Sequence, residues 1–290
     1  MKAAPGIPSI FNDVLGPVMR GPSSSHSAAA NRIGRLCRDL AGGDVEHAEI
    51  DYDPSGSLVT THSSQGTDMG LYGGFLGWPA DDARLPDYER YLAESGLQVE
   101  VRYLDFGAVH PNHYRLRIRG ANGRQHSLQA LSTGGGMLEV MDIDGHALNC
   151  AGDYFELLLY LDDEADEERI RAEVTALQAP ERYQRSEASG RLLCFSFSGP
   201  PDASLLRYLD AHPGIEFHRL LQPVLPVLSR RDQAVPFQSA EQMLEFNRGH
   251  DLALWELAVA YESARGGISG AEVLDRTREL LHIMEGSIRE

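Results

Sequence analysis

The chain has 290 residues, of which 42% are hydrophobic, and a formal net charge of −17 from 43 acidic and 26 basic residues. This length is enough for two or three domains with a sizeable core. The acidic balance argues against a nucleic-acid partner, because phosphate contacts need clustered lysine and arginine.

No apolar window approaches the roughly 18 residues of a membrane span, and the first residues lack the pattern of a signal peptide. We therefore expect a cytoplasmic protein with no membrane partner. The three cysteines, Cys37, Cys150 and Cys194, are far apart and form no CxxC pair. Neither a disulfide framework nor a self-contained zinc or iron–sulfur site is indicated. We interpret all three as reduced core residues and predict no metal ligand in this chain.

The first block of the chain predicts a mixed α/β domain over residues 1–146. Residues 22–41 have the apolar spacing of a helix, with serines at its start and Gly42-Gly43 at its end. A strand at 47–53 and a glycine-rich helix within 55–79 follow. A further helix is expected at 81–95, and alternating patterns predict strands at 97–106, 113–120, 124–135 and 137–145.

The second block, residues 147–228, predicts the element order β-α-β-β-α-β of a small ferredoxin-like or ACT-like module. That order occurs in many unrelated domains and carries no function by itself. A polar linker at 229–237 leads to a helical segment, so the third block is 229–290. Ser239 with Gln242, and Ser269 with Glu272, fit helix-capping boxes. These last helices either close the protein's own core or dock on a partner.

The stretch GPSSSHS (21–27) combines three hydroxyl groups and a histidine with the start of a helix. Free backbone N–H groups and the helix dipole favour an anion at such a position. Ser23, Ser24, Ser25 and His26 would suit a carboxylate or a phosphate. The alternative is that these serines are redundant N-caps.

Three further segments of the first block carry similar chemistry. They are TTHSSQGTD (60–68), HPNHY (110–114) with His110 and His113, and STGGGM (132–137). Each is weak alone, because a single histidine is more often structural and a triple glycine mainly permits close backbone approach. Four such segments in one block are typical of loops that converge on a small polar ligand.

These four segments, in their order and spacing, resemble the β-type domain of iron–sulfur-dependent L-serine dehydratases. That family shows GPSSSHT, SLxxTGKGHGTD, HPNT and a GGG segment, and the match covers about residues 8–146. The resemblance implies an α+β protein whose first domain is similar to allosteric substrate-binding domains. The terminal helices resemble the linker and opening helices of the family's α-type catalytic domain.

The resemblance also implies an activity. An L-serine ammonia-lyase eliminates water from L-serine, and the aminoacrylate product hydrolyses to pyruvate and ammonia. A [4Fe–4S] cluster binds the substrate hydroxyl as a Lewis acid while a base removes the Cα proton. We expect the cluster on an α-type catalytic partner chain, within a homo- or hetero-oligomer, and we expect no activity from this chain alone.

Carried over by position, the resemblance implies catalytic roles for His110 and Thr67. A histidine near its usual pKa of about 6.5 suits proton transfer. The implied substrate-binding residues are Ser23, Ser24, Ser25, His26, Gln65, Asp68, Asn112, Ser132, Gly134, Gly135 and Gly136.

One departure from the family pattern concerns the proton acceptor. The family histidine of GHGTD falls on Gln65, and the preceding GK falls on His62-Ser63. Glutamine is not a base near neutral pH. His62 is one helical turn away and is our candidate for the same catalytic role. Three hypotheses stay open: a serine dehydratase subunit, a non-catalytic subunit that senses serine, and a dehydratase or desulfidase for a related β-substituted amino acid.

Overall fold

The computed structural model describes residues 7–186, 191–229 and 234–289. The chain divides into two compact units, Met19–Pro226 and a smaller one that joins Met1–Val18 to Val227–Glu290. Helices and sheets are both present, so the expected α+β class is confirmed. Among the described helices, none is both long and apolar enough to cross a membrane.

The larger unit begins with a six-stranded sheet in the order β2-β1-β3-β4-β5-β6. β1 and β2 are parallel, and the other neighbours are antiparallel. The strands are β1 (Val45–Tyr52), β2 (Gln98–Tyr103), β3 (His113–Gly120), β4 (Gln125–Gly134), β5 (Met137–Ile143) and β6 (His146–Cys150).

The last strand, β6, differs from the sequence-based division of the chain. We expected the first domain to end near residue 146, but β6 starts there and pairs with β5. The short turn after Ile143 makes a hairpin, so pairing continues past the predicted boundary. The division into three domains otherwise stays a prediction.

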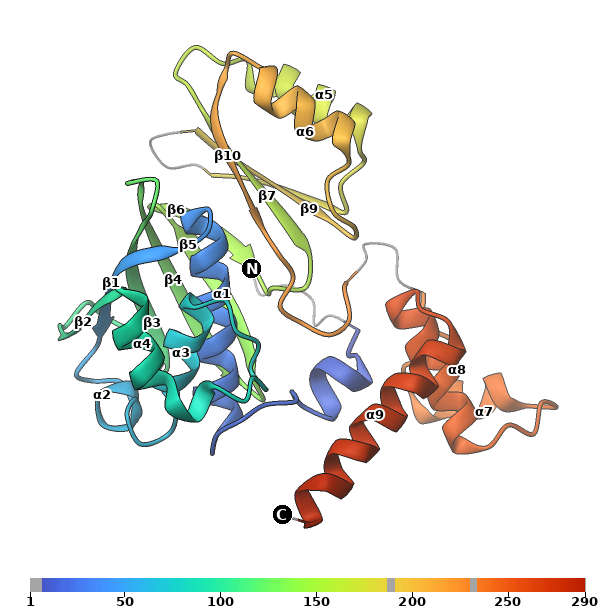
Figure 1. Cartoon of the computed structure of the whole chain (residues 1–290). Helices are drawn as coiled ribbons and strands as arrows, with labels where there is room; N and C mark the ends of the chain where they lie inside the picture. Colours follow the sequence, from blue (N-terminus) through green and yellow to red (C-terminus); the bar gives the residue numbers. More distant parts are fainter. Residues whose placement is uncertain (1–6, 187–190, 230–233, 290) are drawn as a thin grey trace. The chain divides into compact units, whose positions relative to one another are not determined.

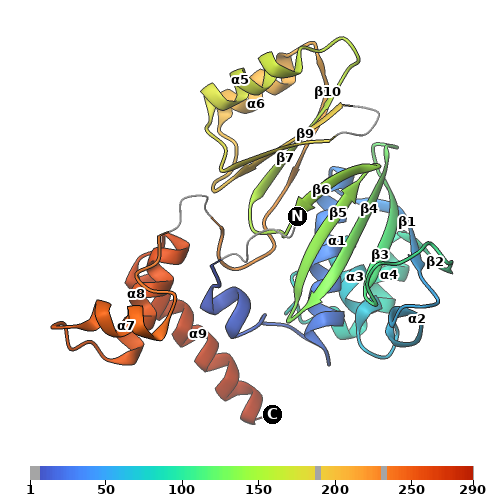
Figure 2. The same cartoon turned by 180° about the vertical axis from the view of Figure 1, so that it is seen from behind.

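Helices α1 and α3 cover one face of this sheet (Figures 1 and 2). The predicted helix at 22–41 is present as η2 followed by α1, and it ends at Gly42 with φ +80°. The helical segments of this layer are η2 (Ser24–Ala28), α1 (Ala29–Ala41), α2 (Leu58–Thr61), α3 (Thr67–Phe75), η3 (Leu85–Asp87) and α4 (Tyr88–Ser95).

Glycines bring the α1 and α3 segments into direct backbone contact. A Cβ atom on Gly34, Gly70 or Gly74 would lie 2.1–2.3 Å from a backbone carbonyl oxygen of the facing segment. No real side chain is tolerated at that distance, so the glycine-rich pattern of residues 70–77 reflects close packing. This contact sets the position of the loop that precedes α1.

The second sheet of the larger unit has four antiparallel strands in the order β10-β7-β9-β8. The elements follow the expected β-α-β-β-α-β order. These elements are β7 (Phe155–Leu161), α5 (Glu167–Leu177), β8 (Arg182–Arg185), β9 (Arg191–Phe197), α6 (Ala203–Ala211) and β10 (Ile215–Leu221). Residues 187–190, where we expected a turn, lie outside the described residues.

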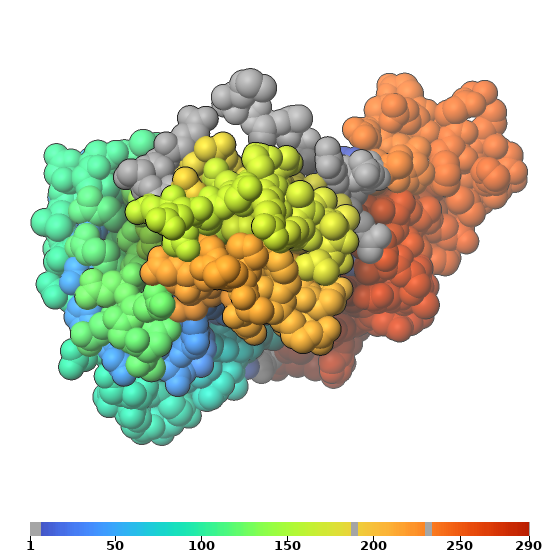
Figure 3. All heavy atoms as spheres, turned by 90° about the horizontal axis from the view of Figure 1, so that it is seen from above, coloured from blue at the N-terminus to red at the C-terminus, as the bar shows by residue number. Residues whose placement is uncertain are grey.

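Both faces of this second sheet are buried. α5 and α6 cover one face and form the outer surface in Figure 3. On the other face, Leu158, Leu192 and Cys194 join the core of the six-stranded sheet. Burial on both faces explains why β7 and β9 are nearly continuous apolar runs and not alternating ones.

The smaller unit is held together by buried polar contacts between its two chain segments. Glu262 of α8 accepts hydrogen bonds from Ser9 Oγ (2.5 Å) and from the Ile10 N–H (2.7 Å). Residues 7–18, which the sequence-based division placed in the first domain, therefore pack with the C-terminal helices. The elements are η1 (Ile10–Val14), α7 (Ala240–Asn247), α8 (Leu254–Gly266) and α9 (Gly270–Arg289).

The serine half of each predicted capping box is present in α7 and α9. The reciprocal half is not formed in α7, because Gln242 Oε1 accepts from the Gln238 N–H and not from that of Ser239. Ser239 Oγ accepts from the Gln242 N–H at 3.3 Å, and Ser269 Oγ accepts from the Glu272 N–H at 3.1 Å. Residues 230–233 of the predicted linker lie outside the described residues. The helices close a small core of Phe11, Val227 and Val273. Other large apolar side chains stay exposed, namely Leu244, Leu254, Trp255, Leu281, Met284 and Ile288.

The helix contact in the larger unit generates a stability prediction. Gly74→Ala places a methyl group 2.3 Å from the Asn31 carbonyl oxygen, and we expect it to destabilise the fold by about 1–3 kcal/mol and lower Tm by roughly 2–10 °C. Differential scanning calorimetry measures this. The control is Gly286→Ala, on the open surface of α9, which should not lower the Tm. An equal Tm for both variants would contradict the packing argument.

Candidate functional site

The four motif-bearing segments meet at one end of the six-stranded sheet. β1 is antiparallel to β3 and β3 is antiparallel to β4, so the carboxyl ends of β1 and β4 lie beside the amino end of β3. α2 and α3 follow β1, and the loop before α1 lies against α3. The site is therefore built from loops on a rigid sheet, as is common for binding sites.

The serine loop, residues 21–27, is shaped by glycine and by its own hydroxyl groups. Gly21 has φ +110°, and a Cβ there would lie 2.5 Å from Ser27 Oγ. Ser23 has extended backbone, and its Oγ lies 3.2 Å from Ser25 Oγ. Within the described chain, the Ser23 side chain makes no capping hydrogen bond. This geometry disfavours the alternative that the serines serve only as N-caps.

The serine loop is hydrogen-bonded to the start of α3. His26 Nδ1 and Thr67 Oγ1 are 3.0 Å apart, and Ser27 Oγ donates to the Gln65 carbonyl oxygen at 3.2 Å. Gly66 permits this approach with φ +80°. Burial lowers the pKa of His26, so its imidazole is neutral at neutral pH. Two motifs that are about 40 residues apart thus form one structure.

His62, Asp68 and Tyr103 form a second hydrogen-bonded group. His62 Nδ1 donates to Asp68 Oδ2 at 2.7 Å, and His62 Nε2 lies 2.8 Å from the Tyr103 hydroxyl. Because the carboxylate accepts a hydrogen bond from Nδ1–H, Nε2 of the neutral ring is an acceptor for the Tyr103 O–H. Burial raises the pKa of Asp68, and the hydrogen bond from His62 opposes that shift. The group holds a histidine with its basic nitrogen defined.

The HPN segment joins the serine loop through β4. Ser132 Oγ donates to the Ser25 carbonyl oxygen at 2.6 Å, and the Ser132 N–H donates to the Asn112 carbonyl oxygen at 3.0 Å. The Asn112 N–H donates to His110 Nδ1 at 3.1 Å. Because Nδ1 of His110 is an acceptor, the proton of its neutral ring is on Nε2. His110 and His62 therefore have opposite hydrogen-bonding roles at Nε2.

The triple glycine forms the turn between β4 and β5. Gly134, Gly135 and Gly136 all have positive φ, between +62° and +104°. The buried Arg32 guanidinium donates to the Gly136 carbonyl oxygen. Burial lowers the pKa of Arg32 to about 10, which leaves it charged at neutral pH. A buried cation thus lies directly against the glycine turn.

Two motif residues, Gln65 and His113, have surroundings that the sequence did not indicate. Gln65 is exposed, and its backbone carbonyl is the group that binds the serine loop. His113 is buried and packs edge-on against Phe106, with ring centroids 5.0 Å apart. Burial also lowers the pKa of His113. These contacts give His113 the character of a structural residue.

Three residues of the candidate site were not predicted from the sequence: Ser57, Tyr103 and Arg32. Ser57 Oγ donates to Asn112 Oδ1, and Ser57 is the first residue of the SLVTTHSSQGTD motif, so a signal for it was present. Tyr103 lies at the end of β2, outside every motif. Arg32 occupies an otherwise apolar helix face, and an arginine there carries no pattern that marks it as buried.

The buried His26 generates a prediction about pH. Its folded pKa is lowered, so the unfolded chain binds more protons and stability falls as pH drops below the unfolded value of about 6.5. Between about pH 7.5 and 5.5, the free energy of unfolding of the wild type should fall more than that of His26→Asn. Urea unfolding at several pH values measures this. Parallel pH curves for the two proteins would exclude the predicted linkage.

No protein-family model matches the chain. Two curated proteins are similar to it. The probable L-serine dehydratase beta chain of Bacillus subtilis (strain 168) is 36% identical over 155 residues, which cover 53% of this chain and 69% of that protein. The L-serine dehydratase beta chain of Peptoniphilus asaccharolyticus is 31% identical over 148 residues, covering 51% and 66% of the two chains. With this identity and coverage, the chain belongs to the L-serine dehydratase beta-chain family.

Proposed function

We propose that this chain is the β-type part of an L-serine ammonia-lyase, which acts with an α-type catalytic partner and eliminates water from L-serine to give pyruvate and ammonia. The observation that carries the proposal is the convergence of four separate segments at one end of the sheet. Ser25, Thr67, Asn112 and Ser132 are linked there to the two histidines His26 and His110 by hydrogen bonds and by short stretches of chain.

The serine loop is the proposed carboxylate site. The start of η2 presents backbone N–H groups, and the Ser23, Ser24 and Ser25 hydroxyls add donors. Burial keeps His26 neutral, so it orients Thr67 without adding charge. The turn of Gly134, Gly135 and Gly136 lets the backbone approach the substrate closely. Gln65 and Asp68 complete the proposed binding set, with Asp68 acting through His62.

The two histidines with opposite roles suit the two proton transfers of the elimination. His62 Nε2, an acceptor held by Asp68, is the proposed base for the Cα proton, and Tyr103 must release it first. His110 carries the proton of its ring on Nε2 and is the proposed hydrogen-bond donor to the leaving hydroxyl. The hydroxyl departs as water after it takes up the proton that His62 removes from Cα. The aminoacrylate then hydrolyses to pyruvate and ammonia.

The cysteines of this chain do not fit a [4Fe–4S] cluster at the proposed site. Such a cluster is held by several thiolates, whereas Cys37, Cys150 and Cys194 are all buried in the core. Among the described residues, none of the three takes part in the hydrogen bonds of the site. We therefore assign the cluster to the partner chain, and we assign only substrate binding and proton transfer to this one.

The partner's docking surface is proposed to include the smaller unit. Its helices expose Leu254, Trp255 and Met284, each more than half accessible. Large apolar side chains that form a common exposed patch mark protein–protein contacts. The relatives are named as beta chains, which supports an α-type partner and an oligomeric enzyme.

We further propose that the four-stranded sheet with α5 and α6 is an ACT-like module and that the first domain is similar to allosteric substrate-binding domains. The strand order β10-β7-β9-β8 supports the first assignment. A cleft of about 920 Å³ is lined by residues of both sheets, with Arg117, Arg119 and Arg124 beside the acidic Glu49 and Asp144.

The three arginines of this cleft favour a second candidate function, a regulatory subunit that senses serine or a related small carboxylate without turnover.

The proposed function is tested with the full chain co-expressed with an α-type partner from the neighbouring reading frame and reconstituted anaerobically with iron and sulfide. Pyruvate formation from L-serine is the readout. We expect His62→Asn and His110→Ala each to lower kcat by roughly 10²–10⁴-fold, because each removes a proton-transfer group. Asp68→Asn should also lower kcat, because an amide can donate as well as accept and would no longer fix the His62 tautomer.

The control is His218→Ala, a half-buried histidine on β10 away from the loops, which should keep wild-type kcat. If both histidine variants retain full activity, the proton assignments are wrong. If the assembled wild type binds L-serine without forming pyruvate, the sensing function is favoured. Turnover of L-cysteine with release of sulfide, but not of L-serine, would indicate the related β-substituted substrate.

A further inference from the structure

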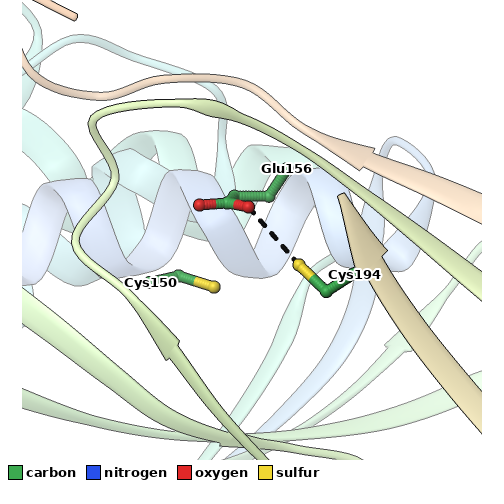
Figure 4. A group of neighbouring side chains, drawn as sticks. All are labelled: Cys150, Glu156 and Cys194. Carbon is green, nitrogen blue, oxygen red and sulfur yellow. Dashed lines mark hydrogen bonds between the residues drawn. The ribbon is translucent and has the colours of Figure 1, made fainter. Parts of the chain in front are cut away.

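Three side chains with metal-binding atoms meet in the core where the two sheets join. Cys150 ends β6, Glu156 lies on β7 and Cys194 lies on β9. Their sulfur and carboxylate atoms all lie within 4.8 Å of one another, and each residue is at most 1% exposed. Figure 4 shows the three side chains pointing toward a common centre.

The Glu156 carboxylate is incompletely satisfied. Its Oε2 accepts hydrogen bonds from Ser196 Oγ (2.6 Å) and from Cys194 Sγ (3.3 Å). Its Oε1 is buried and has no hydrogen-bond partner among the described residues. A buried carboxyl group with an unsatisfied oxygen is costly in free energy unless a cation or a donor compensates it.

Two thiolates and one carboxylate form a ligand set that zinc accepts. Zinc binds cysteine sulfur and carboxylate oxygen in tetrahedral geometry, and with three protein ligands it keeps a position for water. Sulfur ligands disfavour magnesium and calcium, which prefer oxygen. Ser196, which donates to Glu156 Oε2, would orient the carboxylate as a neighbouring hydrogen-bond donor.

The local charge also fits a divalent cation. Once metal binding has released the ligand protons, two thiolates and a carboxylate carry three negative charges, and zinc leaves one uncompensated. The Arg182 guanidinium is close enough to act electrostatically on Glu156, and it is held by a 2.6 Å hydrogen bond to the Asn149 carbonyl oxygen. Arg182 therefore offsets part of the remaining charge.

We propose that Cys150, Glu156 and Cys194 bind one zinc ion, which joins the two sheets of the larger unit. Cys150 belongs to the six-stranded sheet, and the other two ligands belong to the four-stranded sheet. A metal ion would cross-link the two layers and add its binding free energy to the stability of their contact. The site shares no residue with the serine loop or its partners, so the proposal does not depend on the dehydratase assignment.

The test uses the full chain, purified metal-free in a reducing buffer and titrated with Co²⁺ as a spectroscopic probe. We expect one equivalent of Co²⁺ per chain to produce thiolate-to-cobalt charge-transfer absorption, and one equivalent of Zn²⁺ to abolish it. Zinc should raise Tm by several degrees, because it binds only the folded site. Cys194→Ala and Glu156→Gln should weaken or lose the absorption and the Tm shift.

The matched control is Cys37→Ala, which removes an equally buried cysteine from α1 and should leave both signals unchanged. X-ray absorption at the zinc edge of the loaded wild type should show two sulfur ligands at about 2.3 Å, and this readout does not require a variant to fold. Only nitrogen and oxygen ligands, or loss of the signals in Cys37→Ala alone, would overturn the proposal. A Cys150–Cys194 disulfide with no zinc binding after reduction would overturn it as well.

Discussion

The backbone contact between α1 and α3 is the constraint on which the larger unit depends. Three glycines let the two segments approach until carbonyl oxygens occupy the space of side chains. Gly70 brings the start of α3 against Ser27, so His26 reaches Thr67. At the other end of α1, the Leu40 carbonyl oxygen accepts a hydrogen bond from Arg219 of β10, and Asp39 accepts one from the N–H of Gln222, just after β10. One helix therefore positions both the serine loop and the second sheet.

The polar groups of the site are ordered by partners that the fold brings from a distance. Asp68 holds His62 with an acceptor at Nε2, whereas the Asn112 N–H leaves His110 with a donor there. Identical side chains thus acquire different proton-transfer capacity from their hydrogen bonds. The loops that carry these groups are far apart in sequence but lie at one end of the same sheet. The four loops together therefore define a site, although no single motif does.

Local patterns were sufficient for most of the fold. The helix at 22–41, the strands of both sheets and the caps at Ser239 and Ser269 follow from apolar periodicity, glycine stops and capping residues, which act over a few residues. The patterns failed where distant segments pair. β6 extends the first sheet because it pairs with β5, and the segment before Val18 joins the C-terminal helices through the buried Glu262.

The sequence by itself determined the element types, the motif order and the family, because each depends on short segments whose residues lie close together along the chain. Only the tertiary structure decided which candidates meet. It joined His26 to Thr67, assigned His113 to the core, and brought Ser57 and Tyr103 into the site. It also placed Cys150 beside Cys194, although spacing had suggested three unrelated cysteines. Contacts between residues far apart in sequence depend on sheet order and helix packing, which local patterns do not encode.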